Sequence, residues 1–217
     1  MRRFCLFKVY QFDIINTEKP YYALQNLIFN YSYVFYEGDC FWSQVNPYID
    51  VNADQPSLAS LSQKFLKGLP QERIDICASA ENEIMAMFNG KEYDNQKILD
   101  AFSAMCKDIA KERKRLGGDW AMAMAVPFRA HRDHIRAELG PDLVFVVLNM
   151  TKDDQKARIK ARHGDKESSA NDLLLNAYDL YEPATKDENN AIDVLITPEM
   201  SPDDVVDKIL KMIKENV

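Results

Sequence analysis

Residues Leu143–Leu148, with the sequence LVFVVL, form a continuous apolar run rich in β-branched side chains. A run of this length without polar residues predicts a strand that is covered on both faces, in the middle of a parallel sheet. Helical patterns flank it, at His131–Leu139 before the run and at Lys152–Arg162 after it. Alternation of strands and amphipathic helices predicts an α/β fold, with a three-layer parallel β-sheet and helices on both faces.

Further strands are expected on both sides of this central run. They are Phe4–Phe12, Tyr33–Tyr36, Trp120–Val126 and Ile192–Ile196. The chain closes with a helix over Ser201–Ile213, which opens S-P-D-D: an N-cap serine, a proline at the first helical position and two acids in the first turn. We therefore expect about five strands in a single domain over residues 1–217.

Two segments depart from simple alternation. Residues 41–118 are too long for one crossover and carry helical patterning, so we expect a helical insertion that ends in a helix over Asn95–Leu116. The basic residues at the end of that helix suit its dipole, although a phosphate or nucleic-acid patch is the alternative interpretation. Residues 163–186 are polar around one apolar patch, which is typical of a lid with a short helix.

Composition narrows the function classes. The chain has 34 acidic and 27 basic residues and a net charge of −7, which disfavours nucleic acid as a partner. It contains no run of 18 apolar residues, so we expect no membrane partner. The four cysteines are scattered and form no C-x-x-C pair, which favours free thiols and a cytoplasmic location.

The first candidate site residue is Asp39, in the stretch F-Y-E-G-D-C-F directly after a predicted strand. In open α/β sheets, ligands bind beyond the carboxyl ends of the strands. A carboxylate at this position can accept a proton from a hydroxyl group or hold a polyol through hydrogen bonds. The alternative is that Gly38 and Asp39 simply form a turn.

Two arginine clusters follow other predicted strands. Arg129 and Arg132 lie at a strand-to-helix junction, where guanidinium groups can clamp an anionic substrate or form surface ion pairs with Asp133 or Glu138. Arg158 and Arg162 lie one turn apart before the expected lid. Arginines of a lid neutralise charge during phosphoryl transfer, and the alternative is a helix end that complements its own dipole.

In their order along the chain, these clusters resemble the gluconokinase family of P-loop small-molecule and nucleotide kinases. The matching stretches are Tyr36–Asp39, Ala130–Arg136 (similar to Y-R-D-x-L-R), Leu143–Arg162, Leu173–Pro183 with Asp187 and Glu188, and Val194–Ile196. The resemblance implies a P-loop kinase-like fold, use of ATP and Mg²⁺, and phosphoryl transfer to a small hydroxylated acceptor. It assigns Asp39 to the acceptor hydroxyl, Arg129 and Arg132 to acceptor binding, and Arg158 and Arg162 to the nucleotide phosphates.

One feature of the resemblance is missing from the sequence. The family's G-x-x-x-x-G-K-[ST] loop, whose backbone N–H groups and lysine hold the phosphates, is absent, and the first glycine is Gly38. Three hypotheses therefore stay open. The protein is an ATP-dependent kinase whose phosphate loop is unconventional or is missing from this chain through an alternative start or exon, or it is a catalytically inactive kinase-fold protein that acts as a binding or interaction module. The third is a structural α/β protein without a ligand, because every basic cluster also has a surface explanation.

Overall fold

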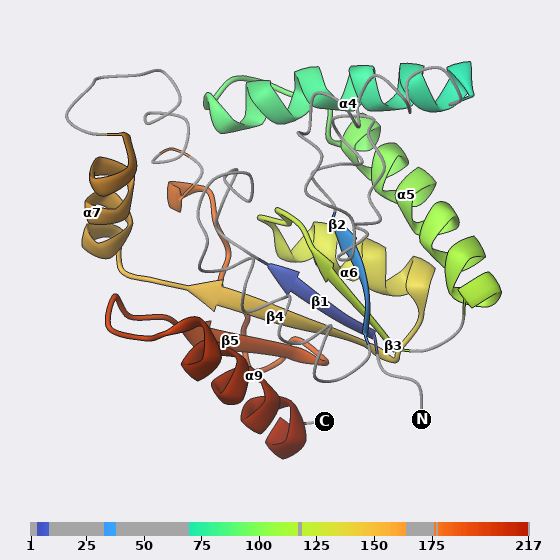
Figure 1. Cartoon of the computed structure of the whole chain (residues 1–217). Helices are drawn as coiled ribbons and strands as arrows, with labels where there is room; N and C mark the ends of the chain where they lie inside the picture. Colours follow the sequence, from blue (N-terminus) through green and yellow to red (C-terminus); the bar gives the residue numbers. More distant parts are fainter. Residues whose placement is uncertain are drawn as a thin grey trace, which may run out of the picture.

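The computed structural model describes residues 4–8, 33–37, 70–116, 119–163, 176 and 178–216 (Figure 1). Its elements are β1 (Phe4–Lys8), β2 (Tyr33–Glu37), α4 (Gln71–Phe88), α5 (Asn95–Leu116), β3 (Asp119–Ala123), α6 (Arg129–Leu139), β4 (Leu143–Asn149), α7 (Lys152–His163), β5 (Ala191–Leu195) and α9 (Pro202–Asn216). Asp39, residues 41–69 of the expected insertion and residues 164–175 of the expected lid lie outside the described residues.

The strands form one parallel sheet in the order β2-β3-β1-β4-β5. The LVFVVL run is β4, which pairs with β1 on one side and β5 on the other, and its first six residues are buried. The expectation of a buried strand inside a parallel sheet is thus confirmed. The chain leaves β1 toward β2 and leaves β4 toward β5, so a crevice for ligands is expected between β1 and β4 at their carboxyl ends.

Helices cover both faces of the sheet, which gives three layers. Helices α4, α5 and α6 lie on one face and α9 on the other (Figure 1). Successive β4 side chains alternate between the two cores: Phe145 packs with the α4–α6 side, whereas Val144 and Val146 pack with the α9 side. Each buried aliphatic or aromatic side chain stabilises the fold by about 1.5–3 kcal/mol, so both faces contribute to holding the sheet.

Most helix boundaries agree with the sequence pattern, and the differences have local causes. Helix α5 spans the expected residues, while α6 begins at Arg129, two residues earlier than expected, because Phe128 is the extended N-cap residue (φ −102°, ψ 147°). Strand β3 ends at Ala123 rather than Val126, since its ladders with β1 and β2 both end there. Within the described residues, none of the helices combines the length and apolarity needed to cross a bilayer.

Candidate active site

Three of the described helices follow a strand at the carboxyl edge of the sheet. Helix α6 starts at Arg129 after β3, α7 starts at Lys152 after β4, and α9 starts at Pro202 after β5. In a parallel sheet all carboxyl ends meet at one edge, and a helix N-terminus carries a partial positive charge there. This edge is therefore the place where an anionic ligand would be stabilised.

The structure separates the predicted arginines into two groups. Arg129 and Arg132 lie in the first turn of α6, and Arg158 and Arg162 lie one turn apart on α7. The two helices follow β3 and β4, which β1 separates in the sheet. Whether Asp39 lies close to any of these arginines stays a prediction, because Asp39 lies outside the described residues.

Arg132 forms an ion pair that the sequence did not predict. Its side chain is 0% exposed, and Nε and Nη2 each lie 2.7 Å from a carboxylate oxygen of Glu188. Nη1 also donates to the Glu182 carbonyl at 3.0 Å. A guanidinium with no accessible surface cannot contact an incoming acceptor, so in this conformation Arg132 is a buried ion-pair partner rather than an acceptor-binding residue.

The partner carboxylate is kept ionised by this pair. Burial raises the pKa of Glu188, but the hydrogen bonds and charges of Arg132, together with Arg136, outweigh it, so the pKa lies below its ordinary value. Arg136 Nη2 is 3.4 Å from Glu188, and its guanidinium lies over the Phe145 ring at 4.8 Å. Arg136 of α6 thus contacts both Glu188 and Phe145 of β4, which places the ion pair near the β4 side of α6.

Arg129 remains accessible at the start of α6. Its side chain is 39% exposed, with Nη1 at 2.6 Å from Asp187 and 3.3 Å from the Thr185 hydroxyl. The hydrogen bond from Arg129 comes first among the causes that lower the pKa of Asp187 to about 2. An exposed ion pair is worth little, so an anion at this edge can replace Asp187 at low cost.

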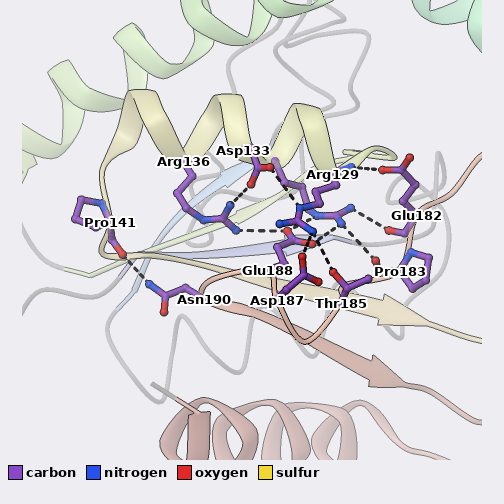
Figure 2. Close-up of polar contacts among 11 residues, drawn as sticks. Arg129, Asp133, Arg136, Pro141, Glu182, Pro183, Thr185, Asp187, Glu188 and Asn190 are labelled. Atoms are coloured by element: carbon purple, nitrogen blue, oxygen red, sulfur yellow. Dashed lines mark hydrogen bonds and ion pairs between the residues drawn. The ribbon is translucent and has the colours of Figure 1, made fainter.

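Helix α6 is capped from a distant part of the chain. Its N-cap residue, Phe128, has no polar side chain, and the Arg129 backbone N–H donates instead to Glu182 Oε2 at 2.6 Å. A carboxylate at a helix N-terminus satisfies a free N–H and complements the dipole. Figure 2 shows Glu182 reaching the start of α6 beside the cluster of arginines and acids.

Residues 178–188 run between the starts of α6 and α7, and we call this segment the strap. At one end Tyr178 donates through its hydroxyl to the Met150 carbonyl at 3.1 Å, and Asp179 pairs with Lys152 Nζ at 2.5 Å. At the other end it enters the arginine cluster of α6 (Figure 2). The strap therefore bridges the β4–α7 junction and α6.

Sequence reasoning did not assign a role to Glu182 or find the function of Glu188. Both act on α6 residues more than fifty positions away, so no local spacing could reveal them. The sequence offers one hint of a buried acid: Asp187 and Glu188 follow the apolar patch within Leu173–Tyr181. Local patterns cannot predict that Glu188 is buried against an arginine partner.

The remaining candidate chemistry near α6 is structural. His131 is buried between the rings of Phe102 and Phe128, and its Nε2 is 2.7 Å from Asn95 Oδ1. In the part of the chain that the structure describes, no group of three or more His, Cys, Asp or Glu residues could hold a metal ion. Mg²⁺ is often bound by only one or two carboxylates together with substrate phosphates, so a magnesium site does not require a group of this size.

Comparison with known proteins identifies the fold. A gluconokinase from Sinorhizobium meliloti 1021 superposes with a TM-score of 0.57 at 14% identity, covering 99% of this chain and 92% of that one. An unliganded sugar kinase from Janibacter sp. HTCC2649 superposes with a TM-score of 0.57 at 15% identity, and the match covers 98% of this chain and 94% of the sugar kinase. The chain has a gluconokinase-like kinase fold.

These similarities extend over the whole chain and agree with the resemblance read from the motifs. No family model matches the chain, and no curated protein matches it. At such low identity the likeness concerns the fold, because unrelated activities can share one scaffold.

Proposed function

We propose that the protein is a small-molecule kinase that transfers the γ-phosphoryl group of ATP to a hydroxyl group of a small acceptor. The observation that carries the proposal is the similarity of nearly the entire chain to a gluconokinase and a sugar kinase. Helix starts at the carboxyl edge, with arginines on α6 and α7, support it because phosphoryl transfer depends on positioning and on charge stabilisation.

Each candidate residue receives a role in this proposal. Asp39 orients or deprotonates the acceptor hydroxyl. Arg129 binds an anionic group of the acceptor, since its guanidinium is accessible and its partners are exposed. Arg158 and Arg162 on α7 act on the nucleotide phosphates, to which Mg²⁺ is bound. Arg132 is left out of the acceptor site because of its burial.

The second candidate is a catalytically inactive kinase-fold protein that binds a nucleotide or a partner. The observation that favours it is the absence of G-x-x-x-x-G-K-[ST] from the sequence. Loss of one preorganised donor of this kind costs about 3 kcal/mol in the transition state, roughly a hundredfold in rate, and this loop supplies several. The kinase has a nucleotide and a small molecule as its partners, and both candidates are placed in the cytoplasm, which suits the buried thiols of Cys77 and Cys106.

A coupled assay of ADP release separates the candidates. The purified chain is incubated with Mg²⁺–ATP and a panel of sugar acids, sugars and polyols that includes gluconate. A kinase releases ADP only when its acceptor is present, and an Asp39→Asn variant loses that dependence. Nucleotide binding without acceptor-dependent ADP release supports the inactive form. Absence of both nucleotide binding and turnover would reject the kinase and would leave only an inactive protein that binds another partner.

A further inference from the structure

Glu182 connects the strap to the start of α6 through its backbone and through its side chain. Its N–H donates to the Pro127 carbonyl at 3.0 Å, its carbonyl accepts from Arg132 Nη1 at 3.0 Å, and its carboxylate accepts from the Arg129 N–H at 2.6 Å. The strap is also held two residues earlier, where Leu180 packs against the hydrophobic core on the α4–α6 side. The Glu182 carboxylate therefore reaches α6 from a backbone that is itself held in place.

Arg129 is the first residue of α6 and the residue whose guanidinium is proposed to bind the acceptor. The N-cap residue, Phe128, forms no side-chain hydrogen bond to the helix. The first N–H groups of a helix have no acceptor within the helix, so the order of a helix start depends on acceptors from elsewhere. Glu182 supplies the acceptor for the Arg129 N–H and thereby fixes the backbone from which the guanidinium projects.

The contacts of the Arg129 side chain are weak by comparison. Nη1 lies 2.6 Å from Asp187 and 3.3 Å from the Thr185 hydroxyl, and Nε lies 3.5 Å from Asp133 on the same helix. These groups are exposed to solvent, and exposed ion pairs contribute little on their own. The place of the guanidinium therefore depends on the place of the Arg129 backbone, which Glu182 holds.

We propose that Glu182 is a positioning residue, whose carboxylate fixes the first turn of α6 and so orients the Arg129 guanidinium toward the anionic group of the acceptor. Glu182 acts through Arg129, and the feature that matters is an acceptor oxygen at this place. The part that concerns the acceptor rests on the proposed function. Control of Arg129 by Glu182 does not, so the two can be tested separately.

The ionisation of Asp187, measured on the full chain by NMR of its carboxyl carbon, reports the position of the Arg129 guanidinium. The hydrogen bond from Arg129 is the main cause that lowers the pKa of Asp187 to about 2. We expect Glu182→Ala to displace the guanidinium and to raise this pKa toward its ordinary value of 3.8. Loss of a nearby negative charge would by itself lower the pKa, so a rise indicates displacement.

A second variant separates the hydrogen bond from the charge. Glu182→Gln keeps an acceptor oxygen for the Arg129 N–H but removes the charge, and it should keep the pKa of Asp187 low. Should Glu182→Ala not fold, Glu182→Asp takes its place. Its carboxylate is one methylene group farther from the Arg129 N–H, so we expect a rise in the same direction.

The ADP-release assay tests the consequence for the acceptor. We expect Glu182→Ala to raise KM for the acceptor about three- to tenfold while kcat and KM for ATP stay near the wild-type values, because Arg129 is assigned to the acceptor alone. Glu182→Gln should restore most of the loss. Glu72→Ala, which removes an exposed acid from the first turn of α4, is the matched control and should change none of these values.

The two measurements fail independently. An unchanged pKa of Asp187 in Glu182→Ala would overturn the proposal even if the protein is an active kinase. Equal rises in Glu182→Ala and Glu182→Gln would overturn it as well, because the acceptor oxygen would then not matter. Equal increases of KM for the acceptor and for ATP would show a general structural role instead. A wild-type chain without acceptor-dependent ADP release counts against the kinase, and a raised pKa in Glu182→Ala would still support control of Arg129 by Glu182.

Discussion

At the scale of single residues, the buried Arg132–Glu188 pair is the feature on which the α6 region depends. Both charges are removed from water, and two 2.7 Å hydrogen bonds together with a backbone carbonyl replace their hydration. A buried pair of this kind is worth little compared with apolar residues of similar volume, but loss of one member is costly. The pair therefore specifies the position of the strap more than it stabilises the fold.

Replacing Glu188 alone should be strongly destabilising. Glu188→Gln leaves the Arg132 guanidinium buried without a counter-charge, and we expect the free energy of unfolding to fall by about 3–5 kcal/mol in urea titrations. The control is Asp187→Asn, which weakens the exposed pair with Arg129 and should cost much less than Glu188→Gln. Equal effects of the two variants would contradict the buried arrangement.

Replacing both members together should be milder than replacing one. Arg132→Met combined with Glu188→Leu removes both charges and fills the site with apolar groups. We expect this double variant to be more stable than either single variant, with a coupling free energy of about 0.5–3 kcal/mol in a double-mutant cycle. Additive losses in the urea titrations would show that the two side chains do not interact.

The same pair predicts a dependence of stability on pH. Because the pKa of Glu188 is lower in the folded chain than in the unfolded chain, its contribution is fully present above the unfolded value of about 4.5 and is lost as the pH falls through the folded value. We expect the free energy of unfolding to decrease below about pH 5. The Arg132→Met/Glu188→Leu variant should decrease less steeply, and identical slopes would exclude Glu188 as the source.

At the scale of helices and strands, the sequence predicted the features that depend on residues close together in the chain, such as a buried strand or a helix cap. The LVFVVL run forms β4, and S-P-D-D forms the start of α9. There the Asp204 N–H donates to Ser201 Oγ at 3.2 Å, and the Ser201 N–H donates to Asp204 Oδ2 at 2.8 Å. The site could not be predicted equally well. Arg132 has the same local pattern as a surface residue, and its burial depends on Glu188, which only the folded chain brings close.

The cap of α9 can be tested separately from its packing. Ser201→Ala removes the hydroxyl that accepts the Asp204 N–H, and we expect a loss of about 1 kcal/mol in the free energy of unfolding, measured in urea. Ser201→Thr retains a hydroxyl at the same position and is the matched control, with a smaller loss. If both variants lose the same free energy, the hydroxyl is not what stabilises the helix start.

At the scale of the whole molecule, the proposed nucleotide site joins elements that are far apart in the sequence. The crevice expected at the carboxyl ends of β1 and β4 would adjoin the junction of β4 and α7, and Arg158 and Arg162 are one turn apart on α7. A nucleotide that binds only the folded chain stabilises it, by about 2.7 kcal/mol at a hundredfold excess over Kd. Binding is therefore measurable as a rise in Tm even where turnover is slow.

The double variant Arg158→Ala/Arg162→Ala should lose most of the Tm increase that Mg²⁺–ATP produces in the wild type. Without the two guanidinium groups, the charges of the phosphates are no longer neutralised from α7. The matched control is Lys156→Ala, which removes an exposed cation from the same helix and should keep the wild-type increase. If the double variant kept the full increase, α7 would have no part in nucleotide binding. If Lys156→Ala lost as much, the effect would come from overall charge rather than from the two arginines, because a change in net charge acts on any anionic ligand.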